Sequence, residues 1–446
     1  MKDYKEYFKG KNITVMGLGL LGRGLGYTKF LAECGANLTV TDLKPSTALK
    51  SSLKELRKYK NIKFVLGKHR LEDFRGKDMI IKSAGVPIDS PYIKEARKHR
   101  IPVEMDVTLL VKLAPKINLV GVTGTRGKSM TTALIYEIFK RNEKSLGKKV
   151  YLGGNIRGIA TLPLLREIKE GDVLVCELDS WQLQGFGESK ISPNIAVFTS
   201  FMPDHMNYYG GSMKKYFSDK ANIFKFQKKE DTLIIRPHIK KIIPKGIKSK
   251  LVIADIKKVS NYTFNVPGVH QRENLACAVA VARLLKVNES GIKKAVKGFK
   301  GLEGRLQYLK QVRGVKIFND NNATTPEATI AGIRALEQEK KGDKIVLIAG
   351  GNDKNLDLGL YVNVINTFCK ALILIPGTGT TKLLKNYKIK VPYEETSGVK
   401  SAVNKAIKYS KKGDIILFSP SFSSFSQFNN EYERNDLFMK IVKGLK

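Results

Sequence analysis

Two glycine-rich segments contain the residue types that hold phosphate groups in proteins. The segment at 121–132, GVTGTRGKSMTT, combines spaced glycines with a lysine and several hydroxyl side chains. Glycines let backbone N–H groups approach phosphate oxygens, Lys128 can reach a β- or γ-phosphate, and Ser129 can face Mg²⁺. Val122 stands where a strict GxxxxGK motif would have glycine, but an apolar stretch precedes the loop and a helical pattern follows it. We therefore predict a triphosphate site here rather than a purely structural turn.

The second segment, GLGLLG at 17–22, also lies between an apolar stretch and a helical pattern. Asp42 follows it at the end of the next apolar stretch, about 20 residues beyond the last glycine. This spacing is typical of loops that bind a nucleotide diphosphate, where the carboxylate accepts hydrogen bonds from a ribose or base. The pattern does not distinguish NAD, FAD and a UDP-linked molecule. A chain with both loops could hold a nucleotide-linked substrate on one and the ATP that activates it on the other.

Side chains that could bind magnesium follow two further apolar stretches. Glu177 ends the stretch VLVCE, where the acidic residue of a phosphate-loop protein lies, and Asp179 is a second candidate. Asp204 and His205 lie in PDHMNYY, directly after the apolar stretch NIAVFTSF. Because parallel strands end at one edge of a sheet, we expect these residues to lie close to the phosphate loop.

Alternating strand and helix patterns would position these residues on parallel sheets. Residues 12–42 are typical of a strand, a glycine turn, a helix at 27–35 and a second strand, and 78–87 of a strand and turn. A second unit begins with a strand at 117–122 and a helix from Lys128, and contains a further helix at 273–286. A third unit opens near residue 304 with four strands and a helix that begins at Pro326, with Thr325 as its cap.

We predict an α/β protein with three α/β domains in series, at 1–114, 115–303 and 304–446. The first is expected to be a Rossmann-like domain that binds the nucleotide-linked substrate. The second is expected to resemble a P-loop ATPase with a mostly parallel sheet, and the third to be Rossmann-like.

The composition of the chain indicates where the protein is located and which kinds of partner it has. The 446 residues are 42% hydrophobic, no apolar run reaches the ~20 residues of a membrane span, and the first residues lack a signal-peptide pattern. We therefore expect a cytoplasmic protein with no membrane partner. The four cysteines are far apart and are expected to be buried free thiols. The net charge of +38 is spread along the chain, so we expect a lysine-rich surface and no nucleic-acid partner. We also expect a monomer.

These segments, taken together, resemble the Mur ligases, the ATP-dependent amino-acid ligases of peptidoglycan precursor synthesis. The resemblance extends over the whole chain, through GVTGTRGKSMTT, GGNIRG, CELDSWQ, PDHMNYY, YFSDKANIF, GVHQRENLACAVAVA and GLEGRL. The C-terminal segments FNDNNATTPEATIAGI, AGGNDKNLDL and SPSFSSFSQFNNEYERND are most similar to the D-glutamate-adding branch of the family. The DNPR- or DNPA-like motif of the branch that adds diaminopimelate or lysine is absent.

The resemblance implies an activity, its cofactors and its catalytic residues. It implies that D-glutamate is added to UDP-N-acetylmuramoyl-L-alanine through an acyl phosphate, with ATP and two Mg²⁺ ions. The catalytic residues that it implies are Lys128, His205 and Lys220, and it implies that Lys220 is carbamylated. The metal ligands that it implies are Ser129, Glu177, His205 and Lys220.

The resemblance also implies binding residues for the three substrates. For ATP they are Gly124, Thr125, Gly127, Lys128, Ser129, Met130, Asn274, Arg305 and Asp320. For the UDP-linked substrate they are Gly19, Leu20, Leu21, Asp42, Ser83, Ala84, Gly85 and Asn155. For the incoming amino acid they are Thr324, Lys354 and Ser424.

Three alternatives stay open at this point. Asn322 stands where the D-glutamate-adding branch has a lysine, and Glu431 lies near an expected phenylalanine, so a Mur-type ligase for another amino acid is one alternative. A nucleic-acid-associated P-loop ATPase is favoured only by the charge. A nicotinamide dehydrogenase is favoured only by residues 17–42.

Overall fold

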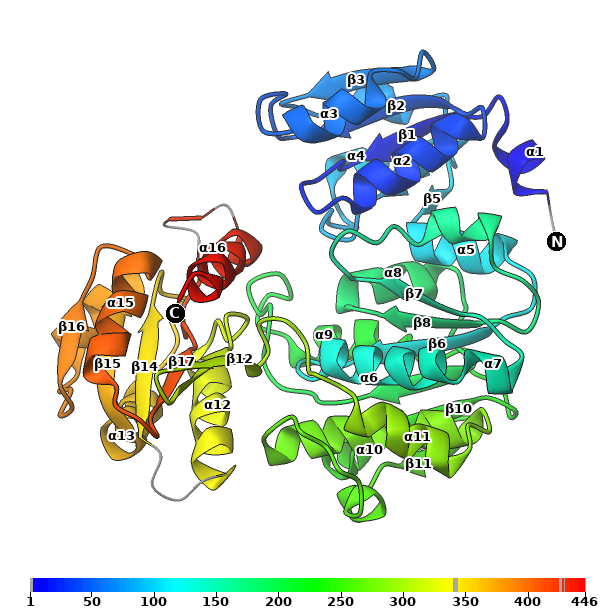
Figure 1. The fold of residues 1–446 in the computed structure, drawn as a ribbon. Helices are drawn as coiled ribbons and strands as arrows, with labels where there is room; N and C mark the ends of the chain where they lie inside the picture. Colours follow the sequence, from blue (N-terminus) through cyan, green and yellow to red (C-terminus); the bar gives the residue numbers. More distant parts are fainter. Residues whose placement is uncertain (1–2, 340–343, 425–426, 429, 446) are drawn as a thin grey trace. The chain divides into compact units, whose positions relative to one another are not determined.

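A computed structural model describes residues 3–339, 344–424, 427–428 and 430–445 (Figure 1). The chain forms two compact units. Unit 1 comprises Met1–Asn261 and Glu273–Ala295, and unit 2 comprises Tyr262–Arg272 and Val296–Lys446. Unit 1 contains two β-sheets and unit 2 contains a third, each with helices packed on it.

The first sheet has five parallel strands in the order β3-β2-β1-β4-β5. Its strands are β1 (Asn12–Met16), β2 (Asn37–Asp42), β3 (Ile62–Leu66), β4 (Met79–Lys82) and β5 (Val103–Glu104). The helices of this region are α1 (Tyr4–Phe8), α2 (Arg23–Glu33), α3 (Lys50–Leu56), α4 (Pro91–Lys98) and α5 (Asp106–Leu113). The strand order reverses between β1 and β4, and ligands of doubly wound sheets bind at such a switch point.

The second sheet has six parallel strands in the order β11-β10-β9-β6-β8-β7. Its strands are β6 (Asn118–Thr123), β7 (Val150–Gly154), β8 (Val173–Glu177), β9 (Ile195–Phe198), β10 (Thr232–Ile235) and β11 (Lys250–Ile253). Its helices are α6 (Lys128–Arg141), α7 (Glu143–Leu146), α8 (Ser180–Glu188), α9 (Met213–Ala221), α10 (Val269–Leu284) and α11 (Glu289–Lys297). β6 lies at the centre, so the loop that follows it is flanked by the ends of β8 and β9.

The third sheet is mixed, in the order β12-β13-β17-β14-β15-β16, with β12 antiparallel to β13 and the other pairs parallel. Its strands are β12 (Gln307–Val312), β13 (Val315–Asn319), β14 (Ile345–Gly350), β15 (Cys369–Ile375), β16 (Tyr393–Glu395) and β17 (Ile415–Phe418). Its helices are α12 (Pro326–Glu339), α13 (Gly359–Phe368), α14 (Thr378–Asn386), α15 (Val399–Tyr409) and α16 (Glu431–Lys443).

The sheets form where the sequence has β-branched and apolar residues that can be buried on both faces. β8, β9, β14 and β17 are buried along their whole length. One apolar cluster continues from the first sheet into the second, and includes Leu110 of α5 with Leu174 of β8. The third sheet has separate clusters on its two faces.

The predicted α/β fold and its mostly parallel sheets are confirmed, and the differences are local. The helix expected at 27–35 begins already at Arg23, and the one expected at 273–286 runs from Val269 to Leu284. The helix at Pro326 is confirmed, but the Thr325 hydroxyl has no hydrogen-bond partner among the described residues, so the predicted side-chain cap is not made. All four cysteines are free and buried, as predicted.

Candidate active site

The loop between β6 and α6 is held by hydrogen bonds to the residues that follow β9. Ser200 accepts a hydrogen bond from Thr125 N through its carbonyl (2.8 Å) and one from Arg126 N through its hydroxyl (2.8 Å). The Thr199 hydroxyl donates to Arg126 O (2.6 Å). A Cβ at Gly124 would lie 2.1 Å from Thr199 Oγ1, so only glycine fits this close approach. The result is a fixed backbone loop at the N-terminus of α6, where anions are stabilised.

Two lysines converge on this loop. Lys128 Nζ donates to Gly124 O (3.0 Å) and Thr125 O (3.2 Å), and Lys220 Nζ donates to the same Gly124 O (2.9 Å). Lys220 is 1% exposed, and its ammonium lies over the Tyr216 ring. Burial lowers the pKa of Lys220 well below its usual 10.5, and the charge of Lys128 lowers it further. The structure thus brings together two of the three predicted catalytic residues.

His205, the third predicted catalytic residue, lies in the segment after β9. It has a positive φ of 55°, and its ring contacts the Trp181 ring at a tilt of 49° with centroids 4.8 Å apart. Non-glycine residues rarely adopt this conformation, and such residues cluster at functional sites. The neighbouring Asp204 accepts a hydrogen bond from Arg126 of the loop (3.3 Å), which ties this segment to the phosphate loop.

The acidic residues after β8 have different surroundings. Glu177 is 6% exposed and lies at the end of β8, opposite Val122 of β6. Asp179 instead is the N-cap of α8, where its side chain accepts a hydrogen bond from Gln182 N (2.7 Å) and stabilises the helix. Within the described part of the chain, no three His, Cys, Asp or Glu side chains gather into a metal site. The oxygen donors of Glu177 and Ser129 nevertheless fit the preference of Mg²⁺.

Asn274 and Arg236 flank the other side of the loop. Asn274 Oδ1 accepts a hydrogen bond from Thr131 Oγ1 of α6 (3.0 Å) and another from Arg236. A Cβ at Gly127 would lie 2.5 Å from Asn274 Oδ1. Asn274 therefore lies beside the loop, as expected. Arg236, which is 5% exposed, was not singled out in the sequence because it follows an unpredicted strand, β10. The predicted ATP residue Met130 is 2% exposed and can offer only its backbone.

The first glycine-rich loop lies between β1 and α2, at the switch point of the first sheet. Asp42 Oδ2 accepts from Gly19 N (2.8 Å) and its Oδ1 from Lys44 N (2.8 Å), so this carboxylate holds the loop closed. Ser83 N donates to Met16 O (2.9 Å), and a Cβ at Gly17 would lie 2.5 Å from Ser83 Oγ. The predicted residues from the ends of β1, β2 and β4 thus lie at one edge of the sheet.

The remaining predicted residues of unit 1 are arranged around this edge or beside β8. Leu20 is exposed, and Leu21 O accepts a hydrogen bond from Gly158 N (2.8 Å). Ala84 and Gly85 continue the exposed turn after Ser83. Asn155 N donates to Glu177 O (2.8 Å), which places Asn155 beside the end of β8.

In unit 2, predicted residues from three strand ends gather at one edge of the third sheet. Lys354, after β14, donates to the Thr324 hydroxyl after β13 (3.0 Å). Ser424 follows β17, whose strand lies between the other two, and is 4% exposed. Three positions of the motif at 419–436, namely 425, 426 and 429, lie outside the described residues.

Asp320, also after β13, is buried in the same unit. Its carboxylate accepts from Ser419 Oγ (2.9 Å) and Leu306 N (3.0 Å). Burial raises the pKa of Asp320 to about 7, while these hydrogen bonds and the charge of Arg305 oppose the rise. Asp320 and Arg305 are therefore electrostatic neighbours. The hydroxyl partner Ser419 was not predicted.

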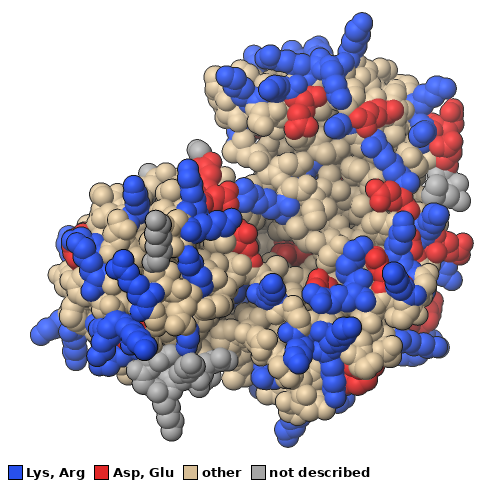
Figure 2. Space-filling view, in the orientation of Figure 1, with Lys and Arg blue, Asp and Glu red and all other residues tan. Residues whose placement is uncertain are grey.

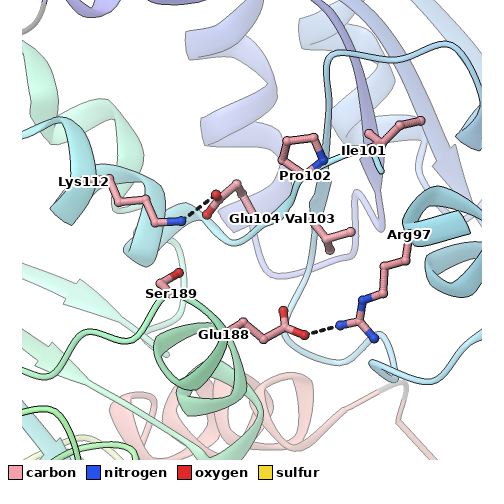
Figure 3. A pocket seen from close by; sticks show the side chains of 8 residues that line it. All are labelled: Arg97, Ile101, Pro102, Val103, Glu104, Lys112, Glu188 and Ser189. Atoms are coloured by element: carbon pink, nitrogen blue, oxygen red, sulfur yellow. Dashed lines mark hydrogen bonds and ion pairs between the residues drawn. The ribbon is translucent and has the colours of Figure 1, made fainter. Parts of the chain in front are cut away.

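A cavity of about 340 Å³ has none of these residues in its lining (Figure 3). It is lined by the end of α4, β5, α5 and the end of α8. Ion pairs Arg97–Glu188 and Lys112–Glu104 lie in its lining.

On the face drawn in Figure 2, Lys and Arg are scattered among Asp and Glu rather than gathered in one tract. No helix in the described part of the chain is long and apolar enough to span a membrane.

Family models match three successive parts of the chain. Residues 11–104 match the Mur ligase MurD-like N-terminal domain, 122–253 the Mur ligase middle domain, and 304–422 the Mur ligase glutamate ligase domain. The chain belongs to the Mur ligase family. The three predicted units of this α/β architecture are therefore those of a Mur ligase, whose members are ATP-dependent and act through an acyl phosphate.

Curated relatives and solved structures agree with this family. The chain is 34% identical over 464 residues to UDP-N-acetylmuramoylalanine--D-glutamate ligase of Borreliella afzelii, with 99% of both chains covered. It is 32% identical over 481 residues to the enzyme of the same name from Acetivibrio thermocellus, with 100% of this chain and 99% of the relative covered. The fold matches UDP-N-acetylmuramate-alanine ligase MurC from Thermotoga maritima with a TM-score of 0.61, 17% identity and coverage of 97% and 99%.

Proposed function

We propose that this Mur ligase adds D-glutamate to UDP-N-acetylmuramoyl-L-alanine at the expense of ATP. The observation that carries the proposal is the convergence of Lys128 and Lys220 on Gly124 O at the phosphate loop. The Lys128 ammonium suits the transfer of a phosphoryl group to a carboxylate, because donor and acceptor are both anions and repel each other. Lys220, whose pKa is lowered, lies at the same carbonyl oxygen and is proposed below as a carbamylation site. Full-length relatives named for D-glutamate addition support the choice of substrates.

The proposed reaction has two steps. The γ-phosphoryl group passes from ATP to the alanyl carboxylate, and Lys128 offsets the charge that develops on the transferred group. The amine of D-glutamate then attacks the acyl phosphate, phosphate leaves and an amide remains. His205, whose ring contacts Trp181, is proposed as a metal ligand near the reacting carboxylate.

Magnesium would be held by oxygen donors at the phosphate loop. We propose Ser129 and Glu177 for one Mg²⁺, and His205 with a carbamylated Lys220 for the second. The buried side chain of Glu177 and the lowered pKa of Lys220 support these roles, since the neutral amine is the form that can add CO₂. Bound Mg²⁺ supplies positive charge that neutralises phosphate oxygens.

The substrate sites follow the clusters described above. We propose that the switch-point loops of the first sheet bind the UDP group and that Asn155 lies near the acyl end. Thr324, Lys354 and Ser424 would bind the amino acid, and Asn274, Arg305 and Asp320 would complete the ATP site. We further propose domain boundaries near residues 114 and 303, a monomer, and a cytoplasmic location.

An amino-acid screen tests the proposal directly. Phosphate release from ATP is measured with UDP-N-acetylmuramoyl-L-alanine and each of D-glutamate, L-glutamate, D-aspartate and L-lysine, with reactions lacking the UDP-linked substrate as controls. D-glutamate is expected to give the largest stimulation. A larger stimulation by another amino acid would support the second candidate, a Mur ligase of different specificity. Asn322 favours that candidate, since an amide there contributes no positive charge toward a dicarboxylate.

A further inference from the structure

Arg434 of α16 is the largest side chain in the described residues that is completely buried, with 0% exposure. Its Nε donates to Asn321 Oδ1 (2.8 Å) and its Nη2 to Asn321 O (3.0 Å). Its Nη1 donates to Phe422 O (3.3 Å). Asn321 belongs to the loop after β13 and Phe422 to the loop after β17, so one guanidinium connects the two loops.

The surroundings of this guanidinium are unusual for a buried charge. Its three hydrogen-bond acceptors among the described residues are uncharged oxygens, rather than a carboxylate. Burial lowers the pKa of Arg434 to about 10, and the nearby charge of Glu431 opposes the shift. A buried ion is costly unless it is paired, and an apolar side chain of similar volume often stabilises a fold as well. The packing of α16 alone therefore gives no reason for an arginine here.

Both connected loops carry residues of the proposed amino-acid site. Thr324 lies three residues beyond Asn321, and its hydroxyl accepts the hydrogen bond from Lys354 (3.0 Å). Ser424 lies two residues beyond Phe422. A backbone hydrogen bond from Ser421 N to Ala323 O (2.8 Å) and the bond from Ser419 Oγ to Asp320 Oδ2 (2.9 Å) also link the loops. Arg434 thus adds three bonds to a junction whose geometry sets the separation of Thr324 and Ser424.

Asn435, the next residue of α16, contacts the last residue of β13. Asn435 Oδ1 accepts from Asn319 Nδ2 (2.8 Å), and Asn435 Nδ2 donates to Glu303 Oε1 (2.5 Å). Asn319 in turn accepts from Asn321 N through its side chain (3.1 Å). Two adjacent buried polar residues of one helix therefore bond to the last residue of β13 and to the loop that follows it.

We propose that Arg434 is a positioning residue that sets the affinity for the incoming amino acid by fixing the loop after β13 against the loop after β17. This role rests on the proposed function, because it assumes that Thr324, Lys354 and Ser424 bind the amino acid. Small displacements of such groups weaken binding, since the hydrogen bonds and charge pairs that select a ligand are directional.

Replacement of Arg434 by methionine, which keeps an apolar stem of similar length, tests this role. KM for D-glutamate is expected to rise about tenfold or more, while KM for ATP and for the UDP-linked substrate changes less than about twofold. Arg434→Lys keeps the charge and fewer of the donors, and is expected to lie between wild type and Arg434→Met. If Arg434→Met does not fold, Arg434→Lys and Asn321→Ala give the same comparison.

The matched control is Phe438→Leu on the same helix. Phe438 is buried and stacks on Phe418 of β17 with centroids 4.1 Å apart, so the change loosens α16 without touching either loop. It is expected to lower the melting temperature and leave KM for D-glutamate unchanged. The role is refuted if Arg434→Met and Arg434→Lys keep the wild-type KM for the amino acid, or if all three KM values rise equally. Failure of the proposed function is seen separately, as a wild-type enzyme that prefers another amino acid, and that amino acid then replaces D-glutamate in the measurement.

Discussion

The two glycine-rich loops of unit 1 have the same order of strand, loop and helix but are held in opposite ways. Asp42 closes the loop after β1 by accepting from Gly19 N, so a negative charge is part of that loop. The loop after β6 is held by the neutral groups of Thr199 and Ser200, and the Nζ atoms of two lysines donate to its Gly124 O. The comparison shows that glycine spacing provides backbone freedom, while the surrounding side chains decide how much anionic charge a loop can accept.

A buried lysine lies beside each loop, and the two lysines have different neighbours. Lys82 is 2% exposed and donates to Val86 O (3.0 Å), and the carboxylates of Glu188 and Asp179 partly oppose the effect of burial on its pKa, which falls to about 8. Lys220 is buried too, and the ammonium of Lys128 adds to the effect of burial while carboxylates oppose it, so its pKa lies well below the usual 10.5. The second loop therefore combines a charged lysine with one that releases its proton easily, as proposed for phosphoryl transfer and carbamylation.

Lys128→Ala is expected to have the largest effect and to separate the two loops. Removing the cation that faces the transferred phosphoryl group should reduce turnover about 10³-fold or more, as for other charge-stabilising residues of phosphoryl transfer. Affinity for the UDP-linked substrate, measured by calorimetry, should stay nearly unchanged because that site lies on the other loop. Lys140→Ala, at the far end of the same helix, is the control and should keep activity, since Lys140 forms an exposed ion pair with Glu143. Parallel loss of turnover and of UDP-substrate binding in Lys128→Ala would show that the loops are not separate sites.

Lys82→Met is expected to stabilise unit 1 in a pH-dependent manner. Below pH about 8 the folded and unfolded states both carry the proton, so the cost of the buried charge is fully present in the wild type. Between pH about 8 and 10.5 the unfolded state holds a proton that the folded state releases, so wild-type stability rises. The gain from Lys82→Met should therefore be about 2–3 kcal/mol near pH 7 and should shrink toward pH 10.

Urea unfolding of unit 1 can be followed through Trp181, the single tryptophan of the chain. Lys63→Met, on the exposed surface of β3, is the control and should show no such pH dependence. A gain in Lys82→Met that stays constant from pH 7 to pH 10 would mean that Lys82 does not titrate in this range.

The sequence predicted the strands that carry candidate site residues better than it predicted the other strands. The strands that carry Asp42, Glu177 and the phosphate loop are short apolar runs followed by polar residues, and each is present. β3, β5, β7, β10, β11, β12 and β16 were not predicted. Most of them are short or partly exposed, and β10 is buried but only four residues long. The partners supplied by distant segments were missed for another reason. Arg236, Ser419 and Arg434 become important only through contacts between residues far apart in the chain, for which one sequence contains no signal.

Asp42→Asn is expected to have the smallest effect and to sharpen the contrast between the loops. Gly19 N and Lys44 N donate to different oxygens of Asp42, and asparagine puts an NH2 donor in place of one of them, so one of the two bonds is lost. Loss of one charge-assisted hydrogen bond should loosen the loop after β1 and weaken UDP-substrate binding about tenfold. KM for ATP should not change, because neutral groups brace the loop after β6.

Asp78→Asn provides the matched control for this change. Asp78 Oδ2 accepts from Asn12 N (2.7 Å) at the start of β1, so the substitution removes the same charge and weakens the same kind of bond at the opposite end of that strand. If the carboxylate of Asp42 acts through the loop, only Asp42→Asn should weaken binding of the UDP-linked substrate. If both variants weaken it equally, the effect comes from the net charge of the first sheet, and the closed loop is no more than a structural turn.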